Sequence, residues 1–181
     1  MEAITSLDVR ILEALYAVRD PLVVQVLIWV SELGRVPTVY GLAAIIALAL
    51  LLKRHYAYAA GLAISVVTSG LGILVTKGLI ERGRPDQFYQ AYLESWHSFP
   101  SAHAALGAAL YGFLMYTVWH LSPTPYFRYI SLAAGIVIIG SIGISRVYLG
   151  VHYASDILAG LVLGVVCVWL GVKLTTLVRS S

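Results

Sequence analysis

Five long apolar runs, each ended by charged or aromatic residues, constrain the fold of this sequence more than any other feature. A helix that crosses the hydrocarbon core of a bilayer needs about 20 mostly apolar residues. Only 12% of the 181 residues are charged, whereas a soluble domain carries about a quarter. The sequence therefore predicts an all-α integral membrane bundle with about five transmembrane helices, near residues 36–52, 57–79, 103–120, 127–144 and 156–177.

The first 33 residues have a different pattern. Apolar residues recur at helical spacing among charged ones, which predicts an amphipathic helix in the membrane interface: Ile4, Leu7, Ile11, Leu15 and Val18. Leu22–Val30 is apolar but too short to span, so we expect a second interfacial helix or a re-entrant piece. A sixth span near 15–33 is the alternative, although it would bring Arg19 and Asp20 into or near lipid.

No internal repeat or low-complexity linker divides the sequence. We therefore expect one membrane-embedded domain over residues 1–181, with residues 1–33 as its interfacial N-terminal segment.

Three short polar stretches lie at the ends of apolar runs: Lys77–Pro85, Pro100–His103 and Ser145–Asp156. The number of spans between them places all three on one face of the membrane. Ionisable residues that converge at a membrane helix end indicate a functional site. We expect them to form one site.

The residue types in these stretches suit a tetrahedral anion. Lysine supplies a point charge and arginine a planar fork of donors, so Lys77, Arg84 and Arg146 are candidate ligands of a phosphate. The start of the third span, at Ser101 and Ala102, adds the free N–H groups of a helix N-terminus and a hydroxyl donor.

Two histidines suit phosphoryl transfer, because one imidazole can attack phosphorus while the other protonates the leaving oxygen. His152 and Asp156 are four residues apart, which places them on one face of a helix. We therefore expect His152 to be the nucleophile and Asp156 to orient its ring. His103 is then the acid, and later the base that activates water.

The three stretches in this order resemble the signature of the type-2 phosphatidic acid phosphatase superfamily. The matching residues are Lys77, Arg84 and Pro85, then Pro100, Ser101 and His103, then Ser145, Arg146, His152 and Asp156. The resemblance implies a metal-independent membrane phosphatase without a cofactor. It also implies the same roles for His152, His103 and Asp156, and phosphate binding by Lys77, Arg84, Ser101 and Arg146.

Ala102 departs from this signature, which usually has glycine at that position. Alanine restricts positive φ. We expect residue 102 to be helical, so that the alanine has no cost.

The expected substrates are lipid phosphates: a polyprenyl diphosphate of the undecaprenyl type, phosphatidylglycerol phosphate, phosphatidate or a lipid A phosphate. A lipid phosphotransferase would use the same histidines. A non-enzymatic transporter is disfavoured because the charges gather at one interface, and a vanadate-dependent haloperoxidase because such relatives are soluble. The sequence has no basic face for nucleic acid and does not indicate an oligomeric state.

The charges outside the site bear on orientation. Seven Lys and Arg residues fall on the face of the three motifs and five on the other face. Subtracting Lys77, Arg84 and Arg146 leaves four against five, so the count alone does not decide the orientation. The pairs Lys53 with Arg54 and Lys173 with Arg179 closely flank spans on the other face. We therefore expect a plasma (inner) membrane protein whose site faces outward. We expect Glu81 and Arg82 to lie on the loop surface, and His55, His97 and His120 in the interface.

Overall fold

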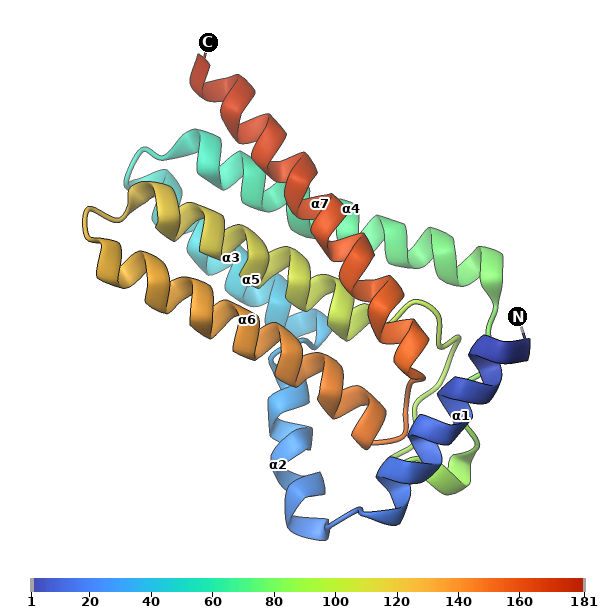
Figure 1. The fold of residues 1–181 in the computed structure, drawn as a ribbon. Helices are drawn as coiled ribbons and strands as arrows, with labels where there is room; N and C mark the ends of the chain where they lie inside the picture. The colour runs from blue at the N-terminus through green and yellow to red at the C-terminus, as the bar shows by residue number, and fades with distance from the viewer. Residues whose placement is uncertain (1, 181) are drawn as a thin grey trace.

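The computed structural model describes residues 2–180, with side chains from residue 5 onward. Each of the five long apolar runs forms one helix, and no strand is found in the described range (Figure 1). The helices are α1 (Glu2–Ala17), α2 (Pro21–Glu32), α3 (Val36–Leu52), α4 (Tyr56–Ile80), α5 (Ala102–Leu121), α6 (Pro125–Tyr148) and α7 (Ala154–Ser180), with a short 3₁₀ turn η1 (Gln87–Tyr89) between α4 and α5. The prediction of an all-α bundle is confirmed. The prediction of one domain includes Met1 and Ser181, which lie outside the described residues, and stays a prediction.

The first predicted span differs from the expectation. Helices α4, α5, α6 and α7 are each long and apolar enough to cross a membrane. Helix α3 has 17 residues and is only about 26 Å long at 1.5 Å per residue, shorter than a hydrocarbon core of about 30 Å. Together α2 and α3 pass the same test, with a bend of 43° between them. Residues 21–52 therefore form a broken span or a re-entrant pair.

The break between α2 and α3 lies close to the start of α5. A Cβ atom at Gly34 would be 2.8 Å from the Ile142 side chain and 3.0 Å from the carbonyl oxygen of His103, so only glycine fits there. Pro37 follows at the start of α3, where its missing N–H is not needed. The bend thus packs the connection between α2 and α3 against α5, next to the polar stretch Pro100–His103.

The centre of the bundle is formed by α4, α5 and α7, with α3 packed on α4 and α6 on α5 (Figure 1). Small residues allow α5 and α7 to approach closely, as their spacing predicts. A Cβ atom at Gly164 of α7 would lie 2.5 Å from the Ala108 Cβ and 2.6 Å from the Ala105 carbonyl oxygen of α5. This contact fixes the two helices that carry His103 and Asp156.

Helix α1 lies across one end of the bundle and packs on α6, α7 and η1 (Figure 1). Its buried residues are Leu12 and Asp8, while Leu7 and Val18 are exposed. The Ile4 side chain is outside the described residues. The amphipathic helix is confirmed, but the side that faces the protein includes an aspartate that the sequence pattern placed on the polar side.

All three polar stretches lie at the end of the bundle that α1 covers (Figure 1). The backbone joins them directly, because Ser101 N donates to the Asp156 carbonyl oxygen at 3.0 Å and Ser98 N donates to the Arg82 carbonyl oxygen at 2.8 Å. The turns near Arg54 and Pro123 lie at the opposite end. The prediction that the motifs share one face is confirmed.

Candidate active site

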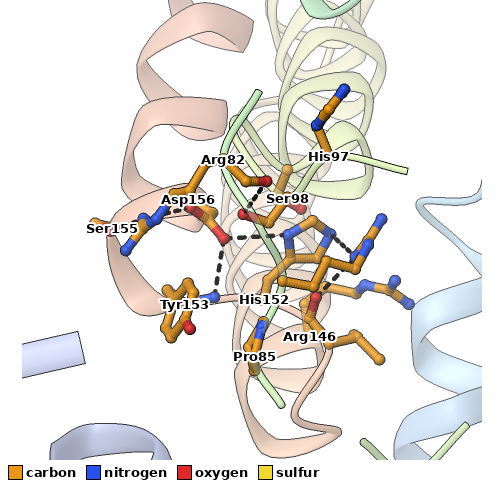
Figure 2. A network of polar contacts seen from close by, with 12 residues as sticks. Arg82, Pro85, His97, Ser98, Arg146, His152, Tyr153, Ser155 and Asp156 are labelled. Carbon is orange, nitrogen blue, oxygen red and sulfur yellow. Dashed lines mark hydrogen bonds and ion pairs between the residues drawn. The ribbon is translucent and has the colours of Figure 1, made fainter. Parts of the chain in front are cut away.

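His152 lies in the short connection between α6 and α7 and is almost completely buried (Figure 2). Its Nδ1 atom is 3.4 Å from Asp156 Oδ2, and its Nε2 atom is 3.2 Å from Arg84 Nη1. A carboxylate beside Nδ1 favours the tautomer with the proton on that nitrogen. The lone pair is then on Nε2.

The predicted contact between His152 and Asp156 is present, but the two residues do not lie on one continuous helix as predicted. His152 precedes the first turn of α7 and is not helical. Asp156 is the third residue of that helix, and its Oδ2 accepts from the Tyr153 N–H at 3.0 Å. A carboxylate that reaches back to the helix start satisfies a free N–H there. The same carboxylate thus begins α7 and faces His152.

His103 is the second residue of α5, two positions after the capping residue Ser101. The hydroxyl of Ser101 accepts from the Ala104 N–H at 3.5 Å, which closes the first turn. Among the described non-glycine residues, only Arg54, Glu81 and Trp96 have positive φ. Ala102 is the first residue of α5 and is helical, as expected.

Two of the predicted cations meet at the His152 side of the site. Arg84 donates to the carbonyl oxygens of Val151 at 2.7 Å and Trp96 at 3.0 Å. Lys77, in the last turn of α4, is buried and donates to the carbonyl oxygen of His97. Backbone oxygens of the loop before α5 and of the connection between α6 and α7 therefore hold these cations beside His152.

Arg146 is fully buried in the last turn of α6. It donates to Ser31 Oγ at 2.7 Å, to Glu94 Oε1 at 2.6 Å and to the hydroxyl of Tyr92. Its Nε is buried without a hydrogen-bond partner among the described residues. An orphaned buried donor on a cation is a group that a bound anion would satisfy.

Sequence reasoning missed Glu94, whose carboxylate also lies 3.3 Å from Arg84 Nη2. The loop that contains Glu94 and Tyr92 has none of the three motifs, so neither residue was among the predicted site residues. The sequence alone contains no signal that would link Glu94 to Arg146, which is 52 positions away. Glu94 joins those two arginines.

A cavity of about 400 Å³ connects these groups. Its polar end is lined by Lys77, Arg84, Glu94, Ala102, His103 and His152. Ser101, Arg146 and Asp156 do not line the cavity and are buried behind this wall. Arg146 contacts the lining residue Glu94, and Asp156 contacts the lining residue His152. The cavity continues between α3 and α4 along an apolar surface formed by Val36, Tyr40, Val67, Leu71 and Leu74.

The surroundings keep the imidazole of His152 neutral. Burial lowers its pKa well below the usual value, and the nearby cations of Arg146, Arg84 and Lys77 lower it further. Burial also lowers the pKa of Arg84. The neutral ring keeps a lone pair that can attack an electrophile.

The sequence suggested that Arg82 lies on the loop surface, but its side chain turns into the protein. Its guanidinium contacts Asp156 Oδ1 at 2.6 Å (Figure 2). It also contacts Asp8 Oδ2 at 2.8 Å. The expectation was wrong because Asp8, which is distant in sequence, faces the bundle from α1. Arg82 therefore contacts the partner of His152 on the side away from the cavity.

Comparisons with known proteins agree with this geometry. The family model of the PAP2 superfamily matches residues 55–179. Phosphatidylglycerophosphatase B of Bacillus subtilis is 32% identical over 170 residues, which are 93% of this chain and 83% of that protein. A lipid A 1-phosphatase of Rhizobium etli is 34% identical over 110 residues, which are 55% of this chain and 43% of that protein.

Solved structures give the same result. The crystal structure of a transmembrane PAP2 type phosphatidylglycerolphosphate phosphatase from Bacillus subtilis superposes with a TM-score of 0.89, at 32% identity over 96% of this chain and 86% of that one. LpxE of Aquifex aeolicus has a TM-score of 0.72 over 92% of this chain and 95% of that one, at 19% identity, which shows the shared fold. By its sequence, its fold and its motifs, this chain belongs to the PAP2 superfamily.

Proposed function

We propose that this membrane lipid phosphatase removes a terminal phosphate from a lipid headgroup through a phosphohistidine intermediate, without a metal ion. One observation carries the proposal: His103 and His152 line the same cavity as Lys77 and Arg84. That cavity runs from charged groups to an apolar surface, which suits a phosphate attached to a hydrocarbon chain.

The first half of the reaction transfers the phosphoryl group to His152. Its Nε2 lone pair forms a bond to phosphorus, and the bond from phosphorus to the lipid oxygen breaks. His103 gives that oxygen a proton, so the lipid leaves as an alcohol. A bound phosphate dianion favours the imidazolium form of His103 that this step requires, because an opposite charge nearby stabilises the charged form.

The second half returns the enzyme to its starting state. Water attacks the phosphorus atom, neutral His103 takes a proton from it, and the bond between Nε2 and phosphorus breaks. Lys77, Arg84 and Arg146 stabilise the charge on the phosphoryl oxygens in both halves. Asp156 holds the ring and stabilises its positive charge. Three cations supply the neutralisation for which other phosphatases use metal ions.

The apolar part of the cavity gives the lipid chain a path. Leu71 and Leu74 line it and are also more than half exposed on the outer surface of α4. The wall from Val67 to Lys77 covers eleven residues of α4, and the rise between its ends is roughly 15 Å. We infer that the acyl chain leaves the site sideways between α3 and α4 and enters the bilayer.

The relative that aligns over most of this chain is a phosphatidylglycerophosphatase. We therefore place phosphatidylglycerol phosphate first, followed by phosphatidate and an undecaprenyl-type diphosphate. The test is phosphate release by the purified protein in detergent from a panel of these lipids, with and without EDTA. We expect turnover that EDTA leaves unchanged and that His152→Ala abolishes. Near-normal turnover by His152→Ala, or EDTA inhibition reversed by Mg²⁺, would refute the mechanism.

We also propose that the site faces outward from the plasma membrane. Lys77 and Arg146 are buried within the protein, and Arg82 turns inward to Asp8 and Asp156. These cations therefore do not act as flanking charges under the positive-inside rule. Labelling of intact cells with an impermeant maleimide tests this. Gln87→Cys should react and Thr124→Cys should not, and the reverse pattern would place the site inside; the native Cys167 is buried.

A further inference from the structure

Asp8 is the buried acidic residue that the proposed reaction does not use. It lies on α1 with 3% of its surface exposed. Its Oδ1 accepts from the Ser155 N–H at 3.0 Å, and its Oδ2 accepts from the Ser155 hydroxyl. Ser155 is the second residue of α7. Asp8 therefore supplies a negative charge and an acceptor to the first turn of the helix that carries Asp156, where both are stabilising.

Arg82 connects Asp8 to Asp156. One terminal nitrogen, Nη2, contacts Asp8 Oδ2 at 2.8 Å, and the other, Nη1, contacts Asp156 Oδ1 at 2.6 Å. The guanidinium also lies over the Tyr153 ring, 4.3 Å from its centroid. A guanidinium is planar and rigid. Contacts at both nitrogens and on its face therefore fix its position.

The two oxygens of Asp156 have separate partners (Figure 2). Arg82 binds Oδ1, which leaves Oδ2 for the Tyr153 N–H and His152 Nδ1. The orientation of the carboxylate toward His152 therefore depends on Arg82. The position of Arg82 in turn depends on the Asp8 carboxylate.

We propose that Asp8 and Arg82 are positioning residues for the nucleophile, acting in the order Asp8, Arg82, Asp156 and His152. The N-terminal helix α1 then completes the active site as well as lying in the interface. This inference rests on the proposed function, because it assumes that His152 attacks phosphorus and that Asp156 orients it.

The substitution Asp8→Asn tests the proposal with little change of shape. It removes the charge that holds Arg82 and leaves Lys77, Arg84 and Arg146 in place. We expect kcat to fall by about 10- to 100-fold, as for a misplaced reacting group. The KM should stay within about twofold because phosphate binding is unaffected. Glu13→Gln, on an exposed part of the same helix, is the matched control and should leave both constants unchanged.

A double-mutant cycle separates positioning from general stability. Phosphate release from phosphatidylglycerol phosphate is measured for the wild-type protein, Asp8→Asn, Asp156→Asn and the double variant. If Asp8 acts through Asp156, its substitution should change the residual rate of Asp156→Asn by less than about twofold. An equal loss in both backgrounds, or an Asp8→Asn rate equal to that of Glu13→Gln, would overturn the proposal.

Folding and the proposed function are checked in the same series. Gel filtration and vanadate binding report whether each variant retains its pocket. If Asp8→Asn is not monodisperse, Arg82→Lys takes its place in the cycle, because lysine keeps the charge but cannot contact both carboxylates. Normal kcat in Arg82→Lys would likewise contradict positioning. Wild-type protein that releases no phosphate from any lipid would refute the function itself, whereas an active wild type with a normal Asp8→Asn refutes only the positioning.

Discussion

At the scale of single residues, the Glu94 carboxylate occupies the space between two arginines that are assigned to phosphate. It contacts Arg146 at 2.6 Å and Arg84 at 3.3 Å. An anion at this position competes with a phosphate for the same donors. It also keeps two buried cations paired while the site is empty, which lowers the cost of burying them.

Glu94→Gln should therefore tighten the binding of inorganic phosphate and vanadate by about three- to tenfold, which corresponds to the net free energy of about one ordinary hydrogen bond. The inhibition constants of both anions measure this. Glu81→Gln, an exposed substitution at the other end of the same loop, is the control. Weaker inhibition in Glu94→Gln would mean that the carboxylate chiefly holds the arginines in place.

The protonation of His152 gives a second prediction at this scale. Burial and three neighbouring cations disfavour its imidazolium, so its pKa lies below the ordinary value of 6.5. The ring should remain neutral as the pH falls through 6.5 and take up a proton only at lower pH. ¹⁵N-histidine NMR of the substrate-free protein measures this midpoint, with His152→Asn to assign the signal. A midpoint at or above 6.5 would contradict the structure.

At the scale of helices, the close contact of α5 with α7 positions His103 relative to Asp156. Gly164→Ala adds a methyl group whose carbon would lie only 2.5 Å from the Ala108 Cβ. The helices must move apart, and we expect a loss of about 1–3 kcal/mol in the free energy of unfolding. Gly140→Ala in α6, where nothing lies within 4 Å, should be neutral or stabilising. Denaturation in detergent compares the two, and equal stability would show that the contact is not restrictive.

Hydropathy predicted the helices that consist of one long apolar run. In lipid, the backbone N–H and C=O groups of such a run have to form their hydrogen bonds within the segment, which requires a helix. It did not predict that α2 and α3 form one bent pair. Leu22–Val30 and residues 36–52 are separated by Gly34 and Arg35, which read as a boundary. The bend depends on the fit of Gly34 against Ile142 and His103, which belong to other helices.

At the scale of the whole molecule, the cavity links a charged end to the lipid-facing surface of α4. Leu74→Trp places a large ring in the apolar part. We expect it to raise KM severalfold for a long-chain lipid phosphate and to leave the turnover of p-nitrophenyl phosphate unchanged, since that substrate has no chain. Val162→Trp, at an exposed position of α7 outside the cavity lining, is the control. Equal effects on both substrates would exclude the lateral path.

The meeting of the three motifs at one end followed from the number of spans between them, and the histidines and cations could be named from their chemistry. Asp8, Arg82 and Glu94 could not. Each acts through a contact with residues more than 50 positions away, Asp8 with Arg82 and Glu94 with Arg146 among them. A single sequence contains no signal for such pairs. The sequence also does not predict where the hydrocarbon chain of the substrate binds, because apolar residues that line a groove resemble those that face lipid.

The most direct test of the site is to find the phosphoryl group on His152. Rapid quench of the purified protein with ³²P-labelled phosphatidylglycerol phosphate, followed by peptide mapping under alkaline conditions, measures this within the first turnover. We predict a base-stable, acid-labile phosphohistidine at His152 that is absent from His152→Ala. Turnover without a labelled histidine, or a label on His103 instead, would contradict the assignment of the nucleophile.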